Sequence, residues 1–388
     1  MTSFLIYFKV VVWLVFLATS SVALGQDLLP FETTAPHAIL VDAKSGNVFF
    51  EKSADELVQP ASMSKLMTMV MVFEALKAGT VTEDTELPIS VNAWKRGGTS
   101  SGGSTMYANV NTNIRLIDLM HGAMIQSAND ACIAIAEGLA GSEEEFAARM
   151  TKRAKELGLQ NAVFGNATGL PKPENRASVR DLTILARYII SEFPEYYKIY
   201  GKPEFTWNKI TQKNRNPLLL DYPGADGVKT GYIKEAGYGL VGSAVRDGRR
   251  LILVVAGLQS ISERKEEAQK LLDWGFRQFK TVDVYAAGDV VSKARVWGGA
   301  SRWVDLVIKQ DLRLALSAKE QESIEVKLSY AGPLMVPVKA GDPIGMVRFV
   351  IDGKAIAEVP VETTNALDAV ESIWSRAMDS LMIMALGG

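Results

Sequence analysis

The order of strand-like and helix-like segments constrains the fold of this chain most strongly. Residues 38–52 read as two short strands around a Lys-Ser-Gly turn, and residues 238–257 as two strands around an Asp-Gly turn. Between them, most of residues 60–220 carries apolar residues at helical spacing. Strands at both ends of a helical stretch predict one antiparallel sheet that closes across a helical insert, which is an α+β fold.

Several segments within this first region predict individual helices. Their apolar residues recur every three to four positions, and they cover residues 63–76, 115–139, 179–190 and 262–279. From about residue 281 the pattern changes to alternation, as at residues 324–329, with a further Asp-Gly turn inside residues 347–361. We therefore expect a first domain over residues 26–280, followed by a small all-β domain over residues 281–366.

The two ends of the chain differ from both domains. Residues 1–25 carry one charge, Lys9, an apolar run too short to span a membrane, and small residues before Gln26, which predicts a cleaved secretory signal. An uncleaved anchor is the alternative. Residues 367–388 place apolar side chains on one face of a helix, so we expect an amphipathic helix at a membrane surface rather than one packed on the β domain.

Composition excludes several classes of function. The chain has 42 Lys and Arg residues against 44 Asp and Glu, a net charge of −2, so no basic excess points to nucleic acid. The single cysteine, Cys132, cannot form an internal disulfide or a zinc ribbon. The two histidines, His37 and His121, lie far apart and form no HExxH motif. Any Ser-His-Asp mechanism would have to use one of these two histidines.

Ser62 and Lys65 form the first cluster that could carry chemistry. They lie three residues apart at the start of a predicted helix, which puts them on one face with an axial rise of about 4.5 Å. A serine needs a base to become a nucleophile, and a lysine can serve if burial lowers its pKa. The free N–H groups of a helix N-terminus also suit an oxyanion. The alternative is an N-cap serine beside a surface lysine.

Two further clusters follow along the chain. Ser127 and Asn129 lie in an apolar helical stretch, where buried polar side chains need partners, or else mark a helix junction. The third cluster enters a predicted strand and consists of Lys229, Thr230 and Gly231. A lysine and a hydroxyl beside a glycine can hold a carboxylate. The alternative is that these residues are an ordinary start of a strand.

The three clusters together are specific, although each is weak alone. The order is S-x-x-K, then S-x-N 65 residues later, then K-T-G after 102 more. This combination is the signature of penicillin-binding proteins and serine β-lactamases. The chain resembles the low-molecular-mass penicillin-binding proteins, specifically the D-alanyl-D-alanine carboxypeptidases. The likeness extends to ASMSKLMT, LMHGAMIQSANDACIAIAE, FGNATGL and DGVKTGYIKEAGYGLVGSA.

The resemblance implies a catalytic role for three residues. Ser62 would attack the bond between the two terminal D-alanines of a peptidoglycan stem pentapeptide, and Lys65 would take its proton. Ser127 would relay a proton to the leaving D-alanine. The residues expected to bind the substrate are Asn129, Lys229, Thr230, Gly231, Tyr232 and Arg264, with the backbone N–H groups of Ser62 and Tyr232 as the oxyanion hole.

The resemblance also implies the setting of the reaction. The fold would be a β-lactamase/transpeptidase-like domain followed by the β-rich domain. No metal or organic cofactor would be needed, and β-lactam antibiotics would acylate Ser62 as substrate mimics. The enzyme would be exported to the periplasmic face of the inner membrane and held there by its C-terminal helix. One departure is Tyr232, where many relatives have histidine; because the oxyanion role uses only backbone, we expect it to survive.

Other functions on the same fold stay open. A D,D-endopeptidase or a β-lactamase would share the acylation step and differ in the acyl acceptor or the rate of deacylation. The loop at residues 164–178 lacks the E-x-x-L-N run of class A β-lactamases, which weakens that alternative. A low-turnover scaffold protein is a third possibility, against which the intact trio of motifs argues.

Overall fold

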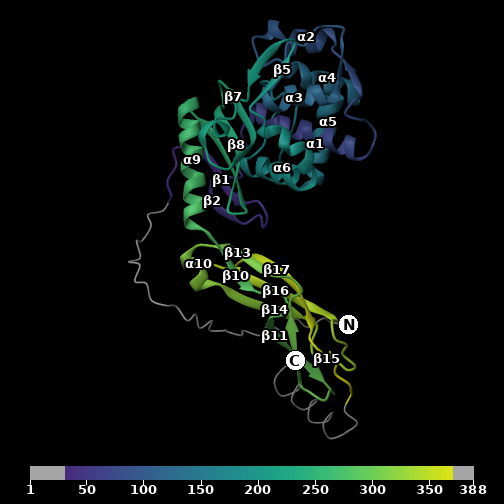
Figure 1. Ribbon diagram of the computed structural model, residues 1–388, viewed down its shortest axis with the longest axis vertical. Coiled ribbons are helices and arrows are strands. Elements are labelled where there is room, and N and C mark those ends of the chain that lie inside the picture. The colour runs from purple at the N-terminus through teal and green to yellow at the C-terminus, as the bar shows by residue number, and fades with distance from the viewer. Residues whose placement is uncertain (1–30, 370–388) are drawn as a thin grey trace. The chain divides into compact units, whose positions relative to one another are not determined.

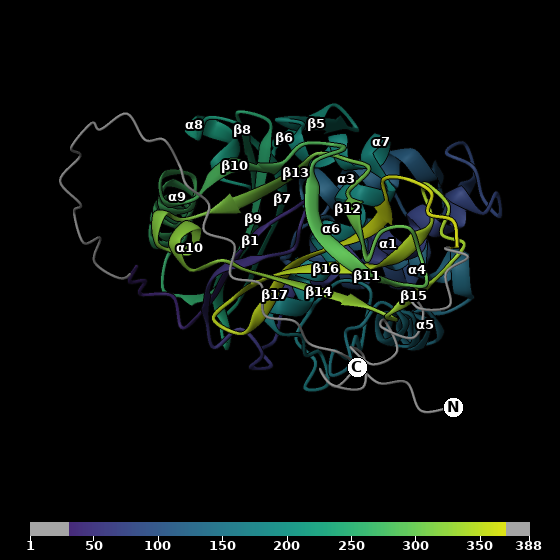
Figure 2. The same ribbon diagram turned by 90° about the horizontal axis from the view of Figure 1, so that it is seen from below.

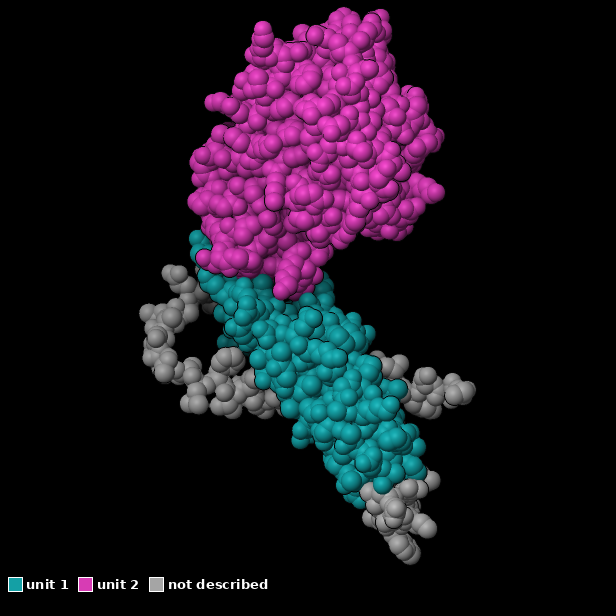
Figure 3. Space-filling model, turned by 45° about the vertical axis from the view of Figure 1, so that its right-hand side comes forward, with its two compact units in different colours: residues 1–28, 277–388 teal, residues 29–276 magenta. Residues whose placement is uncertain are grey.

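The computed structural model describes residues 31–369, which fall into two compact units. The larger unit ends at Phe276 and the smaller one begins at Arg277 (Figure 3). The predicted export signal and most of the predicted C-terminal helix lie outside the described residues. Leu367 and Ala369, at the start of that predicted helix, form isolated β-bridges, so the expected helix does not begin at residue 367. Within residues 31–369, no helix combines the length and apolar character needed to cross a bilayer.

An antiparallel five-stranded sheet forms the centre of the larger unit, as the sequence predicts. Its strands are β1 (His37–Asp42), β2 (Val48–Lys52), β7 (Ala225–Ile233), β8 (Gly237–Arg246) and β9 (Arg249–Leu258). Their order is β2-β1-β9-β8-β7, and every neighbouring pair is antiparallel. The early hairpin therefore joins the late strands through the β1–β9 pair, and β7 is left at one edge of the sheet.

The expected helical insert lies between β2 and β7. Its helices are η1 (Ala61–Ser64), α1 (Lys65–Lys77), α2 (Val91–Gly97), η2 (Thr99–Ser101), α3 (Leu116–Ile125), α4 (Asn129–Ala140), α5 (Glu143–Glu156), α6 (Val179–Glu192), α7 (Pro194–Tyr197), η3 (Lys198–Gly201) and α8 (Leu218–Asp221). It also contains two short hairpins, β3 (Glu86–Pro88) with β4 (Asn113–Arg115), and β5 (Glu204–Trp207) with β6 (Ile210–Lys213).

Both faces of the sheet are buried, as the side chains of strand β9 show. Leu253 and its alternate neighbours belong to a core shared with helix α9 (Ile261–Gln278), whereas Val254 and its alternates belong to the core of the helical insert. Successive side chains of a strand point to opposite faces, so a strand covered on both sides is apolar throughout. Figures 1 and 2 show α9 on one side of the sheet and α1, α3 and α6 on the other.

The predicted helix over residues 115–139 is two helices. Helix α3 ends at Ile125 and α4 begins at Asn129, and Ser127 between them has a positive φ of 65°. This backbone conformation is costly for a residue with a side chain and cannot continue a helix. The apolar spacing runs through the break because both helices are buried in the same core, so spacing alone could not reveal it.

The smaller unit is built almost entirely of strands. They are β10 (Lys280–Tyr285), β11 (Val290–Trp297), β12 (Trp303–Val307), β13 (Leu312–Leu316), β14 (Glu325–Tyr330), β15 (Leu334–Met335), β16 (Pro343–Ile351) and β17 (Lys354–Thr363). Six form one sheet in the order β14-β16-β17-β12-β11-β15, and β10 pairs with β13. The domain was expected to be all-β, but it contains one short helix, α10 (Ala318–Ser323). Ser317 and Glu320 form a capping box that stabilises the start of this helix.

Candidate active site

Ser62 lies in the turn of 3-10 helix that leads into α1. The preceding residue, Ala61, has a positive φ of 49°, so the backbone bends sharply just before the serine. Gly169 packs directly on this bend: a Cβ atom at its position would lie 1.9 Å from the Ala61 carbonyl oxygen. The loop that carries Gly169 therefore fixes the backbone of Ser62, whose side chain stays partly exposed.

Lys65 is buried directly behind Ser62, with only 1% of its surface exposed. Its Nζ lies 2.9 Å from Ser62 Oγ, 2.8 Å from Asn129 Oδ1 and 2.5 Å from the Thr168 carbonyl oxygen. The last two atoms can only accept hydrogen bonds. A neutral Lys65 amine would therefore donate its two N–H groups to them and turn its lone pair toward the Ser62 hydroxyl. This geometry would allow a neutral Lys65 to act as a base toward Ser62.

Ser127 and Asn129 form a second wall of the site, at the break between α3 and α4. Both side chains are almost fully buried. The Asn129 N–H donates to the Ser104 carbonyl at 2.8 Å, while its side chain accepts from Lys65. Ser127 Oγ has no hydrogen-bond partner in the described part of the chain. A buried hydroxyl without a partner is costly, so Ser127 is available to a bound ligand.

Strand β7 supplies the third wall. Lys229 and Thr230 are 3% and 7% exposed, and Lys229 Nζ donates to the Thr230 carbonyl at 3.1 Å. A Cβ atom on Gly231 would lie 2.8 Å from the Pro60 carbonyl oxygen, so the strand lies directly against the turn that carries Ser62. Among residues 31–369, this packing, rather than a side-chain hydrogen bond, joins β7 to the Ser62–Lys65 pair.

The charges of the site favour a neutral amine and an anionic ligand. Burial lowers the pKa of Lys65 to about 8, and the positive charge of Arg215 acts in the same direction. Burial also lowers the pKa of Lys229 well below its usual value, with Lys65 and Arg215 adding to the effect. When Lys229 is charged, Arg215 repels it, and a bound carboxylate would stabilise the charged form of Lys229.

Tyr232 and Arg264 meet through a third residue, Tyr238. The Tyr232 ring is 51% exposed and stacks on Tyr238 with 4.2 Å between ring centroids. The Arg264 guanidinium lies over the Tyr238 ring at 5.6 Å, and burial lowers its pKa to about 10. Arg264 is thus held beside the end of β7 and remains charged at neutral pH.

Three residues of this region were not singled out from the sequence. Thr168 contributes only its carbonyl, and Arg215 acts through its charge, so neither has a motif of its own. Asp130 is fully buried and accepts hydrogen bonds from Thr105 Oγ1, at 2.6 Å, and from the backbone N–H groups of Met106 and Ala108. The sequence signal that could have identified Asp130 as a buried hydrogen-bond acceptor is an aspartate within an apolar helical stretch.

The arrangement can perform acyl transfer. A partly exposed hydroxyl faces a buried amine of lowered pKa, a second buried hydroxyl has no partner nearby, and a cationic strand edge lies beside them. In the described residues, no cluster of three or more His, Cys, Asp or Glu side chains could hold a metal ion.

Comparison with known proteins agrees with this chemistry. Residues 23–260 match the family model of D-alanyl-D-alanine carboxypeptidases, and residues 279–369 match the C-terminal domain of penicillin-binding protein 5. The chain is 34% identical to D-alanyl-D-alanine carboxypeptidase DacA of Haemophilus influenzae over 380 residues, which cover 96% of each protein.

Solved structures show the same relationship. Penicillin-binding protein 5 of Haemophilus influenzae is 36% identical, with a TM-score of 0.76 over 88% of this chain and 99% of that one. Penicillin-binding protein D2 of Listeria monocytogenes, in its ampicillin-bound form, is 29% identical, with a TM-score of 0.55 over 64% of this chain and 99% of that one. The resemblance read from the sequence is therefore confirmed: the chain belongs to the D-alanyl-D-alanine carboxypeptidase family of serine peptidases.

Proposed function

We propose that this protein is a serine-type D-Ala-D-Ala carboxypeptidase, which removes the terminal D-alanine from peptidoglycan stem pentapeptides. The observation that carries the proposal is the position of Lys65. Its two fixed acceptors, Asn129 Oδ1 and the Thr168 carbonyl, leave its lone pair to the Ser62 hydroxyl 2.9 Å away. Membership of the carboxypeptidase family supports the same reaction.

Acylation would begin with the transfer of the Ser62 proton to neutral Lys65. Ser62 Oγ then forms a bond to the carbonyl carbon of the penultimate D-alanine, and the negative charge moves to the carbonyl oxygen. The backbone N–H groups of Ser62 and Tyr232 would stabilise this oxyanion; the close packing of Gly231 on Pro60 keeps their two segments together.

The leaving group departs as the bond between carbon and the amide nitrogen breaks. The nitrogen of the terminal D-alanine takes a proton from the Ser127 hydroxyl, whose Oγ lacks a partner among the described residues. The proton that Lys65 took from Ser62 replaces the one that Ser127 gives up, assisted by the nearby charge of Lys229, while Lys229 and Thr230 on β7, with Arg264, hold the carboxylate of the terminal D-alanine. Water then hydrolyses the ester at Ser62 and releases the shortened peptide as a carboxylate.

β-Lactam antibiotics would acylate the same serine. A related protein of this fold is known in an ampicillin-bound form. A β-lactam carries an amide in a strained ring and a carboxylate, so it presents the two features that Ser62 and the K-T-G strand would recognise. Ring opening would leave the drug as an ester on Ser62.

D-Alanine release from a synthetic stem pentapeptide tests the proposal. The chain without residues 1–25 should release D-alanine, and the Ser62→Ala variant should release none while keeping its fold by circular dichroism. Release by both proteins would reject Ser62 as the nucleophile. Release by neither would reject the carboxypeptidase activity on this peptide, and turnover of a crosslinked peptide or a β-lactam would then favour one of the alternatives.

We also propose that the protein is exported and lies on the periplasmic face of the inner membrane. The support is the signal-like pattern of residues 1–25 and the amphipathic pattern that continues to residue 388. Fractionation of cells should place the full chain with membranes and a chain ending at residue 369 in the soluble periplasmic fraction. Equal membrane association of both chains would reject the C-terminal attachment.

A further inference from the structure

One loop, residues 164–175, contacts both Lys65 and the turn that carries Ser62. The Thr168 carbonyl accepts a hydrogen bond from Lys65 Nζ at 2.5 Å. The next residue, Gly169, has a φ of 74° and packs against the backbone just before Ser62, where a Cβ atom would lie 1.9 Å from a carbonyl oxygen. The geometry of the Ser62–Lys65 pair therefore depends on how these two loop residues are held.

The side chain of Asn166 holds both loop residues. Its Oδ1 atom accepts hydrogen bonds from the Thr168 N–H at 3.2 Å, from the Thr168 hydroxyl at 3.1 Å and from the Gly169 N–H at 2.7 Å. Its Nδ2 atom donates to the Leu170 carbonyl at 3.0 Å. The carbonyl oxygen and the amino group of one asparagine are thus both used to close a bend over residues 166–170.

The shortest of these hydrogen bonds sets the direction of the carbonyl that Lys65 contacts. The Gly169 N–H and the Thr168 C=O belong to the same trans peptide group, in which the two bonds point in opposite directions. Asn166 therefore binds one side of this peptide group and Lys65 the other. A hydrogen bond to the N–H also polarises the carbonyl on the far side and makes it a stronger acceptor.

The loop is fixed to the helices beside the site through Ala167. The Ala167 N–H donates to Glu143 Oε1 on α5 at 3.3 Å, and the Ala167 carbonyl accepts from Thr68 Oγ1 on α1 at 2.7 Å. Because Lys65 lies on the same helix as Thr68, one end of the bend is fixed relative to the amine. The peptide group that faces Lys65 is then oriented by Asn166.

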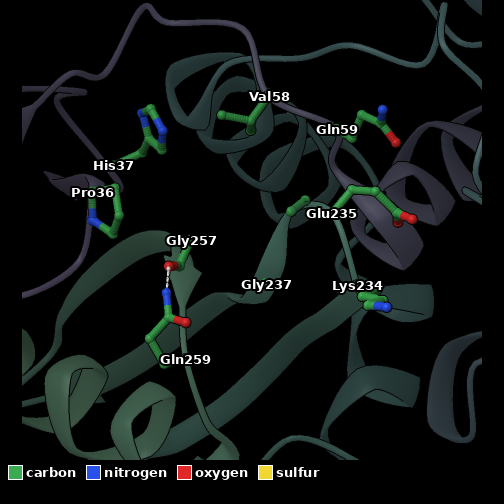
Figure 4. A pocket seen from close by; sticks show the side chains of 10 residues that line it. Pro36, His37, Val58, Gln59, Lys234, Glu235, Gly237, Gly257 and Gln259 are labelled. Atoms are coloured by element: carbon green, nitrogen blue, oxygen red, sulfur yellow. Dashed lines mark hydrogen bonds between the residues drawn. The ribbon is translucent and has the colours of Figure 1, made fainter.

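Asn166 is closed off from solvent. Residues 166–169 are buried, and Asn166 itself is 4% exposed. The open side of this region lies elsewhere: Val58 and Gln59, shortly before the nucleophile, line a pocket of about 460 Å³ to which the loop contributes no residue (Figure 4). A substitution of Asn166 therefore acts on the reaction through the protein and not through a contact with the substrate.

We infer that Asn166 is a positioning residue for the acylation of Ser62: it holds one backbone carbonyl against Lys65, so that the lone pair of the neutral amine faces the Ser62 hydroxyl. The inference rests on the proposed function, which makes Lys65 the base. Asn129 Oδ1 is the second acceptor of this amine. With only Asn129 in place, the amine can turn an N–H toward Ser62 Oγ, and an N–H in that position donates a hydrogen bond instead of accepting a proton.

Asn166→Ala tests the inference with the stem pentapeptide. We expect kcat to fall about ten- to a hundredfold, the effect of a misplaced catalytic group, and KM to stay within about twofold because strand β7 is untouched. The rate of labelling by a fluorescent penicillin, which reports on acylation alone, should fall by a similar factor. Both rates are expressed per molecule that finally binds the label, so that unfolded protein is not counted.

Asn175→Ala is the matched control in the same loop. Asn175 is 2% exposed and, like Asn166, donates to the Leu170 carbonyl at 3.0 Å, but its Oδ1 accepts the Gly165 N–H, at 2.6 Å. Both alanine variants should lower the melting temperature, because each removes buried hydrogen bonds. Only Asn166→Ala should lower kcat by more than about threefold, since Asn166 binds the peptide group that faces Lys65.

Asn166→Asp is the conservative variant. Its carboxylate still accepts the three hydrogen bonds, and Asn175 still donates to the Leu170 carbonyl, so kcat above about pH 9 should stay within about threefold of wild type. The added negative charge favours the ammonium form of Lys65, so the rise of kcat with pH should move up by at least about half a pH unit. This variant tests the inference even if Asn166→Ala does not fold, because a pH profile identical to that of wild type would overturn it.

The outcomes separate this inference from the function on which it rests. If wild-type protein releases no D-alanine from the pentapeptide, the proposed function fails and the positioning role fails with it. If wild type releases D-alanine and folded Asn166→Ala keeps its kcat, only the positioning role is overturned. Equal losses of kcat in Asn166→Ala and Asn175→Ala would also overturn it, because they would reflect the stability of the loop and not the orientation of one peptide group.

Discussion

Gly231 and Pro60 approach so closely that a Cβ atom on the glycine would lie 2.8 Å from the proline carbonyl oxygen. The same added Cβ atom on Gly231 would lie 3.1 Å from Met63 Cγ and 3.3 Å from Ala61 Cβ. These neighbours belong to the turn that carries Ser62, so the contact sets the distance between the two N–H groups of the proposed oxyanion hole. A glycine is required here by this contact and not by its backbone angles.

Gly231→Ala should therefore slow acylation without unfolding the protein. The added methyl group pushes β7 away from the turn, and loss of one oxyanion donor costs about 10²–10³ in rate, so we expect a decrease of at least about tenfold. The second-order rate of labelling by a fluorescent penicillin measures it. Gly165→Ala is the matched control, because its Cβ would meet mainly the flexible side chains of Lys172 and Glu174. Equal labelling rates for the two variants would contradict the argument.

Lys65 should give acylation an acid limb with a pKa of about 8. Burial disfavours the charged amine, and only the neutral amine can take the Ser62 proton. Acylation should therefore rise about tenfold per pH unit from pH 6 toward 8 and level off above it. The measurement uses a β-lactam whose own charge does not change over this range. A rate independent of pH between 6 and 9 would rule out Lys65 as the titrating base.

Much of this molecule could be predicted from its sequence, because its strongest signals are local. The Asp-Gly turn at residues 247–248 and the alternation around it predict the β8–β9 hairpin, which is confirmed. The carboxypeptidase family and the α+β fold are also confirmed, by the family model that matches residues 23–260 and by the similarity to penicillin-binding protein 5. The site roles of the individual residues remain predictions.

The features that were missed depend on contacts between distant segments. Apolar spacing predicts one helix over residues 115–139 where the structure has two, although the polar residues Ser127 and Asn129 had left a helix junction open as the alternative. The Thr168 carbonyl that holds Lys65 is a backbone atom, 103 residues away along the chain. Arg215 acts on Lys65 by charge alone, and a single sequence does not show which cation lies near a buried amine.

Arg215→Gln should move the acid limb of acylation to higher pH. Removing this cation takes away a repulsion that lowers the pKa of Lys65, so a smaller fraction of the amine is neutral at pH 7. The rates of wild type and variant should converge above pH 9. Lys213→Gln, an exposed residue two positions earlier, should leave the profile unchanged. A loss of equal size at every pH would mean that Arg215 contacts the ligand and does not tune the base.

Two substitutions of Tyr232 can distinguish the role of its backbone N–H from the role of its side chain. Its ring is half exposed and stacks on Tyr238, a contact worth about 1 kcal/mol. Tyr232→Ala removes the ring and keeps the N–H, so penicillin labelling should change by less than about tenfold. Tyr232→Pro removes the N–H itself, and proline is tolerated on an edge strand whose N–H faces away from its neighbour.

Labelling of the Tyr232→Pro variant should therefore fall by about 10²-fold or more, the effect of deleting one oxyanion donor. Circular dichroism and thermal melting of both variants establish that each is folded before the rates are compared. Because both substitutions remove the same ring, any rate difference between two folded variants reports on the backbone donor. Equal rates would place the second oxyanion donor on an atom other than the Tyr232 nitrogen.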